Sequence, residues 1–175
     1  FKKALETFSK LKSFSRLGIV VDQVVNQEIS DQINSLEESL KTDKFKLLVL
    51  SIDNKENEIK KRIQEAGIEA ILLPFLPNVD NENISSLIKI AQEANLPVFS
   101  IERNYYLEMG ITASSLNKTS QKALARKVAL NIEESLRGTP VDQLSKTFKV
   151  RESLTINMAA MRALGTRISP NSVTV

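Results

Sequence analysis

The chain has 175 residues and a net charge of +3, and it contains no cysteine, no histidine and only five glycines. This length suits one α/β domain or one large lobe of a protein. Without cysteine and histidine, the chain can form no disulfide, lacks the usual ligands of zinc, and cannot use Ser-His-Asp or Cys-His catalysis.

The glycines lie far apart in the sequence. A Walker loop and a dinucleotide-binding fingerprint both need closely spaced glycines, so neither motif is present. This disfavours an ordinary ATPase, GTPase or Rossmann dehydrogenase. We therefore expect no cofactor, no metal and no catalytic residues.

The charge is unevenly distributed. Residues 1–16 and 101–175 are basic, whereas residues 17–100 are acidic, and aromatic residues make up only 5% of the chain. A nucleic-acid-binding protein would normally combine a basic stripe with aromatic platforms. Here the basic residues are spread along predicted helices beside acidic ones, which indicates solvated helix faces and no nucleic-acid partner.

The first part of the chain alternates between helical and strand patterns. Apolar residues recur at helical spacing over 4–11, and a β-branched run at 17–21 indicates a buried strand that ends at Asp22. Residues 29–40 repeat the helical spacing, and residues 46–52 form the next apolar run.

The next helix has clear signals at both ends. Asp53 is placed as an N-cap, and Glu56 follows it at the spacing of a capping box. The helix carries apolar Ile59 and Ile63 and is expected to end at Gly67, which suits a left-handed C-terminal cap.

Further repeats of strand and helix follow. Residues 70–75 predict a third strand, residues 84–91 a helix that ends near Asn95, and residues 97–101 a fourth strand. The short segment 110–113 is a candidate fifth strand.

This alternation predicts a three-layer α/β/α sandwich with a mostly parallel sheet and right-handed crossovers. Ligands of such sheets bind beyond the carboxyl ends of the strands, where the strand order reverses. The candidate ligand-binding residues at these ends are Asp22, Gln23, Phe75, Asn78, Ser100, Glu102 and Arg103.

Some of these residues have a second interpretation. Arg103 can hold a ligand carboxylate, or it can pair with Glu102 on a surface loop, and both interpretations stay open. Phe75 and Leu76 lie between two prolines. Their side chains either line a cleft or pack into the protein interior, and packing is favoured. A phospho-acceptor role for Asp22 is disfavoured, because Gln23 follows it where a receiver domain needs a second acid.

The tail departs from the alternation. Residues 119–137 predict a long helix with an apolar face made by Leu124, Val128, Ile132 and Leu136. Residues 148–156 alternate as in a half-exposed strand. Asn157 is expected to cap a short helix that runs through Leu164 and ends at Gly165, and its methionines Met158 and Met161 are expected to fill the core.

The tail contains two informative stretches, VALNIEESLRGTPVDQL at 128–144 and FKVRESLTINMAAMRALG at 148–165. Both resemble the C-terminal part of a family of ABC-transporter substrate-binding proteins. The LGIVVD, AILLPF and LPVFSIE segments are similar to the second lobe of that family in order and spacing. The positions that carry the resemblance in the tail are Leu136, Gly138, Pro140, Leu154, Ile156, Asn157, Ala160, Leu164 and Gly165.

The resemblance implies a Rossmann-like lobe of a type I periplasmic-binding-protein-like fold, in which two lobes close around a small ligand. Residues 1–118 correspond to the second lobe. Residues 119–175 correspond to a return helix and a strand-helix unit that completes this lobe, and the first lobe is absent. In this family the return helix crosses back to the first lobe. We therefore expect its apolar face to be buried by another chain, such as a second copy in a homodimer, or by the domain's own sheet.

The tail is closer still to a variant in which such a region is joined to an outer-membrane efflux protein. The resemblance thus implies an ABC permease or an outer-membrane efflux component as partner. It also implies a periplasmic or other extracytoplasmic location, with any membrane association through regions outside this chain.

The sequence departs from the family at two loops. The place after the first strand reads Asp22-Gln23-Val24-Val25-Asn26, and the place after the third strand reads Pro74-Phe75-Leu76-Pro77-Asn78, where small polar residues are usual. These changes leave two hypotheses open. One is a non-enzymatic module that binds a small solute, amino-acid-like or other, and the alternative is a structural or interaction domain that has lost the ligand. A glycosidase-like enzyme has no support in the spacing of carboxylates.

Overall fold

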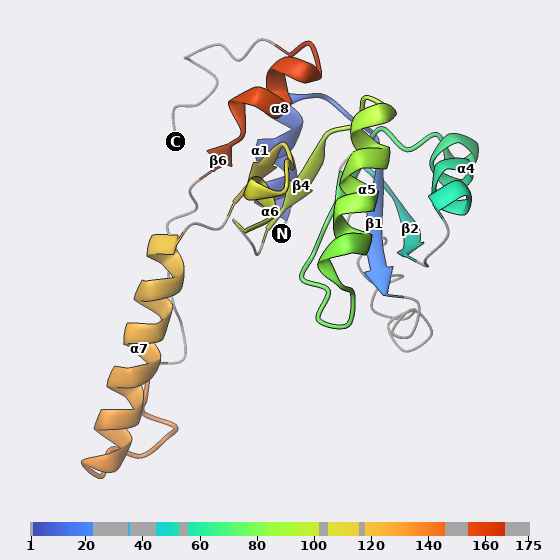
Figure 1. Ribbon diagram of the computed structural model, residues 1–175. Helices are drawn as coiled ribbons and strands as arrows, with labels where there is room; N and C mark the ends of the chain where they lie inside the picture. Colours follow the sequence, from blue (N-terminus) through green and yellow to red (C-terminus); the bar gives the residue numbers. More distant parts are fainter. Residues whose placement is uncertain are drawn as a thin grey trace.

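The computed structural model describes residues 2–22, 35, 45–52, 56–101, 105–115, 118–145 and 154–166 (Figure 1). These residues form a six-stranded sheet with the strand order β2-β1-β3-β4-β5-β6. The strands β1 to β5 are parallel, and β6 runs antiparallel to β5 at one edge. The strands are β1 (Arg16–Asp22), β2 (Lys46–Ile52), β3 (Ala70–Leu72), β4 (Val98–Ser100), β5 (Ala113–Ser114) and β6 (Thr155–Ile156).

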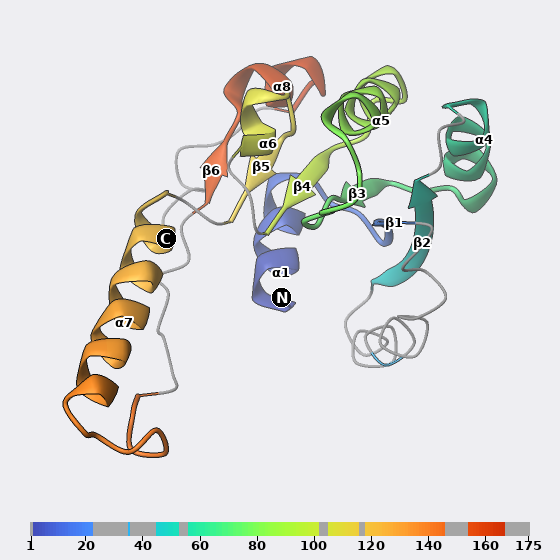
Figure 2. The ribbon, with the colours of Figure 1, turned by 60° about the horizontal axis from the view of Figure 1, so that its bottom comes forward.

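Helices lie on both faces of the sheet, which confirms the predicted three-layer α/β/α sandwich (Figure 2). One face packs against α4, α5 and α6, and the opposite face packs against α1 and Met161 of α8. On the second face the rings of Phe8 and Phe99 are stacked with their centroids 4.4 Å apart. The helices are α1 (Lys2–Leu11), α4 (Glu56–Ala66), α5 (Asn81–Glu93), α6 (Tyr105–Glu108), α7 (Lys118–Leu136) and α8 (Met158–Ala163).

The strand β1 lies at the centre of the topology, because its neighbours β2 and β3 both follow it in the sequence. Six of its seven residues are buried, as expected for a parallel strand covered on both faces. The chain moves outward from β1 in one direction to β2 and in the other direction to β3. This reversal is the kind of position at which open α/β sheets bind ligands.

The helix ends follow local sequence signals. Asp80 caps α5 by accepting a hydrogen bond from the backbone N–H of Asn83 at 2.8 Å. The predicted terminators Gly67 and Gly165 follow α4 and α8 with φ values of 59° and 66°. The predicted cap at Asn157 is confirmed, since its side chain accepts from the N–H groups of Ala159 and Ala160.

Two strand predictions were wrong in their bounds. The third strand was expected to reach residue 75, but β3 ends at Leu72, and only the N–H of Leu73 continues the ladder by donating to Phe99 O at 2.8 Å. Pro74 has no N–H to donate and so ends the pairing. The fifth strand was expected at 110–113, but β5 begins at Ala113, since Gly110 has a φ of 100° and belongs to the preceding turn.

Other predictions fall outside the described residues. These are the helix over 29–40, of which only residue 35 is described, the cap at Asp53 and the part of the last strand over 148–153. Of the two methionines expected in the core, Met161 is fully buried, whereas Met158 is 48% exposed.

The long helix α7 extends away from the sheet in both views (Figures 1 and 2). Its predicted apolar face is exposed at Leu124, Val128, Ile132 and Leu136. The expectation that the domain's own sheet buries this face was therefore wrong, because the helix leaves the sheet after β5. No helix in the described ranges has the length and the apolar character needed to cross a membrane.

Candidate ligand-binding site

The candidate site lies at the carboxyl edge of the sheet, where β1, β4 and β5 each end on a buried polar residue. These residues are Asp22, Ser100 and Ser114, which are 9%, 0% and 0% exposed. Buried strands are normally lined by apolar side chains, so three buried polar side chains at one edge of the sheet mark that edge as a candidate binding site.

The three side chains lie on the same face of the sheet. Val20 and Val98 belong to the core cluster under α4, α5 and α6, and Asp22 and Ser100 each follow them by two residues. Because side chains alternate along a strand, Asp22 and Ser100 point to that same face. Ser114 is the register partner of Ser100 in the neighbouring strand and shares its direction.

Aromatic side chains lie exposed on the loops that follow these strands. Phe75, between β3 and α5, is 43% exposed, and Tyr105, at the start of α6, is 45% exposed. The sequence favoured packing of the Phe75 side chain into the protein, and this prediction was wrong, because the alternation of side chains along the strand stops at Pro74. Leu76, 6% exposed, takes the core position in its place. The neighbouring ring of Tyr106 is buried, with 2% exposure, and lies 6.2 Å from the Tyr105 ring between centroids.

The structure brings four of the seven predicted site residues to this edge. Asp22 and Ser100 end their strands, and Phe75 and exposed Asn78 lie on the β3–α5 loop. The remaining three, Gln23, Glu102 and Arg103, lie outside the described residues.

Sequence reasoning left two residues of this edge out of the predicted set. Ser114 was missed because the fifth strand was placed too early, and Tyr105 was not included although it begins the helix that follows β4. A signal for Ser114 exists in the sequence, since hydroxyl residues alternate at Thr112 and Ser114 in an otherwise apolar context. Thr112 uses its hydroxyl oxygen to accept from the backbone N–H of Val98 at 3.0 Å.

The edge offers one carboxylate, small hydroxyl groups and exposed aromatic rings, which are groups that hold a small molecule by hydrogen bonds and ring contact. Within the ranges that the structure describes, no group of three acidic side chains gathers to hold a metal ion. A carboxylate at the end of β1 and hydroxyl groups at the ends of β4 and β5, on one face of the sheet, are suited to orient a polar ligand.

A cavity of about 300 Å³ lies elsewhere, at the opposite, amino-terminal edge of the sheet. It is lined by residues at the starts of β4 and β5, by the end of α5 and by α8, including Val98, Thr112 and Asn157. Asn157 is already engaged there, because it caps α8 and donates to Leu107 O at 3.3 Å. This cavity is separate from the candidate site.

No protein-family model and no curated protein sequence matches the chain, but solved structures do. One is the open, ligand-free structure of a substrate-binding protein with adhesive properties from Clostridium difficile. It has a TM-score of 0.71 and 22% identity, and the match covers 98% of this chain and 57% of that chain.

Two further structures match over a similar length. A conserved domain protein from Vibrio cholerae O1 biovar El Tor has a TM-score of 0.70 and 21% identity, covering 98% of this chain and 57% of that one. The ABC domain in complex with L-Trp from Streptococcus pneumoniae has a TM-score of 0.68 and 18% identity, covering 96% of this chain and 56% of that one.

The chain thus spans little more than half the length of each solved structure that it matches. At these identities the likeness concerns the fold. The chain has the α/β fold of a periplasmic-binding-protein-like lobe, the fold of ABC-type substrate-binding proteins, as the resemblance in its sequence implied.

Proposed function

We propose that the chain is the second lobe and C-terminal segment of an extracytoplasmic, ABC-transporter-type solute-binding protein. The lobe comprises residues 1–118, and residues 119–175 form the return helix and the strand-helix unit that completes it. The observation that carries the proposal is the row of buried polar side chains, Asp22, Ser100 and Ser114, at the carboxyl edge of this fold.

The ligand is a small solute, and an amino acid or an amine with an apolar body fits the described groups best. The Asp22 carboxylate would attract an ammonium group, and the exposed rings of Phe75 and Tyr105 would contact the apolar body. The L-Trp bound by the Streptococcus pneumoniae domain supports a ligand of this kind. Gln23, Glu102 and Arg103 complete the proposed contacts, because they directly follow β1 and β4.

The mechanism is hinge closure of two lobes around the ligand, with no chemical step. One lobe supplies only half of the contacts, so this chain alone should bind weakly. An ABC permease is the proposed partner of the two-lobed protein.

Calorimetry tests the proposal directly. We expect weak or unmeasurable binding of L-tryptophan and other amino acids to residues 1–175, and clearly tighter binding to the longer protein that includes upstream residues. In the longer protein, Asp22→Asn and Phe75→Ala should each weaken binding about tenfold or more, which corresponds to loss of one good ligand contact. Lys61→Ala, at an exposed position of α4 outside the proposed contacts, is the matched control.

Two outcomes would contradict this function. One is tight binding to residues 1–175 alone, and the other is a set of binding constants that Asp22→Asn and Phe75→Ala leave unchanged. The second would move the site away from the carboxyl edge.

The alternative is a ligand-free interaction domain in an envelope or outer-membrane efflux assembly. The loop after β3 favours it, because Pro74 and Pro77 stand where small polar residues are usual and Phe75 faces solvent. A thermal-shift screen of the longer protein separates the two functions. A shift of several degrees with any amino acid supports solute binding, and no shift with any solute supports the alternative.

A further inference from the structure

The cavity of about 300 Å³ at the amino-terminal edge of the sheet has two walls that are fixed to the same part of the chain. One wall is the end of α5, where Gln92 Nε2 donates to Gly110 O at 3.2 Å. The other wall is α8, where Asn157 donates from its backbone N–H to Thr112 O at 2.9 Å and from Nδ2 to Leu107 O at 3.3 Å. The cavity between these walls is therefore preformed, as small-molecule sites usually are.

The lining of this cavity carries no charged side chain among the described residues. It consists of small or apolar residues and of four uncharged polar ones, which are Gln92, Asn95, Thr112 and Asn157. A bound ion would lose hydration there and gain no opposite charge in return. The lining therefore favours an uncharged ligand.

Thr112 leaves a hydrogen-bond donor unused in this lining. Its side chain is buried, with 3% exposure, and its hydroxyl oxygen accepts from the backbone N–H of Val98 at 3.0 Å. A hydroxyl group can also donate one hydrogen bond, and within the described ranges no group accepts from this one. Buried polar groups are normally paired, so an acceptor atom of a ligand would complete the bonds of Thr112.

Polar groups also lie at the opening of the cavity. Gln92 and Asn95 are exposed residues of the lining. The Nε2 atom of Gln92 is occupied by Gly110 O, whereas its Oε1 atom and the Asn95 carboxamide contact no hydrogen-bonding group of the described residues. Between these groups and Thr112, half-buried Leu96 and Ala160 supply apolar surface.

We propose that this cavity is a second binding site, for a small uncharged molecule that combines an apolar ring with a hydrogen-bond acceptor. A cavity of about 150 Å³ can hold benzene, so the volume found here suits a ring with a polar substituent. The acceptor atom binds the Thr112 hydroxyl, and the ring packs against Leu96 and Ala160.

This second site is independent of the proposed solute site. It lies at the opposite edge of the sheet, and in the proposed function the cleft between the two lobes lies at the carboxyl edge. A first lobe would therefore leave the cavity open, and both sites can be occupied at once.

NMR titration of isotope-labelled residues 1–175 tests the site, with benzamide as the probe. Benzoate and benzylamine are charged controls of similar shape. We expect millimolar benzamide to shift the amide signals of Gly110, Thr112 and Ala160 in a saturable way, without moving those of Ser100 and Ser114 at the carboxyl edge. The two charged compounds should bind at least about threefold more weakly, because the lining does not compensate a charge.

Filling the cavity gives a direct test of its position. Ala160→Leu places a larger side chain in the lining and should raise the dissociation constant of benzamide at least about tenfold. Ala125→Leu, at an exposed position of α7 outside the lining, is the matched control and should leave the binding unchanged.

Changes of the polar groups test the chemistry. Thr112→Val removes the donor and should weaken benzamide binding about fivefold, whereas Thr112→Ser keeps the hydroxyl group and should bind like the wild type. Asn95→Asp tests the same site without touching the core. It adds a negative charge at the opening, so it should strengthen the binding of benzylamine relative to benzamide.

Three results would overturn the proposal. One is the absence of saturable shifts with benzamide, and another is equal binding of benzamide, benzoate and benzylamine. The third is a free Ala160→Leu variant in which the signals of residues 167–175 move, because this would assign the cavity to the chain that follows α8. None of these results bears on amino-acid binding by the longer protein, so either proposal can fail without the other.

Discussion

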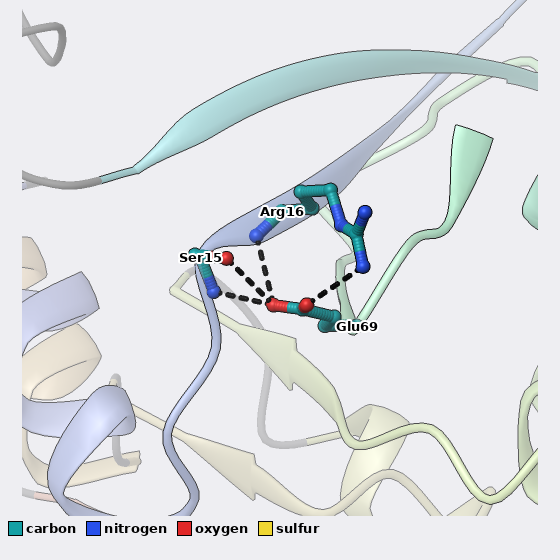
Figure 3. A network of polar contacts seen from close by, with 3 residues as sticks. All are labelled: Ser15, Arg16 and Glu69. Carbon is teal, nitrogen blue, oxygen red and sulfur yellow. Dashed lines mark hydrogen bonds and ion pairs between the residues drawn. The ribbon is translucent and has the colours of Figure 1, made fainter.

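The carboxylate of Glu69 accepts a hydrogen bond from the backbone N–H of Ser15 at 2.6 Å (Figure 3). The same oxygen also accepts from the Ser15 hydroxyl and from the backbone N–H of Arg16, and the other oxygen pairs with the Arg16 guanidinium at 2.9 Å. Ser15 precedes β1 and Glu69 precedes β3, so one side chain ties the starts of two neighbouring strands at the edge opposite the candidate site.

This contact makes stability depend on pH. The pKa of the Glu69 carboxyl is lowered from 4.5 to about 2, chiefly by the N–H of Ser15, with help from the Ser15 hydroxyl and from Arg16. Because the folded-state pKa lies below the unfolded one, the stabilisation is complete above about pH 4.5 and is lost as pH falls toward 2. Glu69→Gln should lower the free energy of unfolding by roughly 1 kcal/mol at pH 7, since the side chain is partly exposed.

Urea unfolding at several pH values checks this prediction. The gap between wild type and Glu69→Gln should narrow as pH falls from 4.5 to 3. The control is Glu65→Gln, which removes the exposed 3.7 Å ion pair with Lys61 and should change little at any pH. A gap of the same size at pH 7 and pH 3 would contradict the role of the Glu69 charge.

The stacked rings of Phe8 and Phe99 give a second prediction. Both side chains are fully buried, and they join α1 to β4. Phe8→Leu should lower the free energy of unfolding by about 1–2 kcal/mol, because it removes the ring contact and leaves a small void. Tyr105→Leu, which changes an exposed ring, should stay within about 0.5 kcal/mol in the same urea titration. Equal losses in the two variants would mean that the stack contributes nothing.

Gly67 and Gly165 form a matched pair, since both have positive φ values after a helix. A Cβ at Gly67 would lie 2.9 Å from a guanidinium nitrogen of Arg16, whereas at Gly165 it would meet nothing within 4 Å. Each change to alanine should cost about 1 kcal/mol for the left-handed backbone, and Gly67→Ala should cost more because it displaces Arg16 from Glu69. Denaturant midpoints of the two variants check this, and a larger loss for Gly165→Ala would be inconsistent with it.

The features predicted well from the sequence are those that depend on nearby residues. The cap at Asn157, the end of α4 at Gly67 and the apolar run of β1 all follow from spacing over a few positions. The contact between Glu69 and Ser15 joins residues 54 positions apart, and it exists because β3 pairs with β1 rather than with β2. No periodicity in the sequence reports that neighbour order.

The candidate site also contains residues that the sequence predicts and residues that it does not. Asp22 and Ser100 were placed at strand ends by the general rule for parallel sheets, and their role in binding stays a prediction. Phe75 was misjudged because Pro74 ends the strand, and the alternation that would have turned the ring inward ends with it. Ser114 was missed because the turn at Gly110 delays β5.

Asn157 gives the last prediction, because its side chain makes two separable contacts. Its Oδ1 accepts from the N–H groups of Ala159 and Ala160 at 3.1 Å, and its Nδ2 donates to Leu107 O at 3.3 Å. Asn157→Ala should lower the free energy of unfolding by about 1–2 kcal/mol, since it removes the helix cap and leaves N–H groups of α8 unpaired. Asn157→Asp keeps the acceptor but loses the donor, so it should cost less than alanine. Urea unfolding of both variants measures the two contributions, and equal losses would mean that the bond to Leu107, not the cap, holds α8 against the sheet.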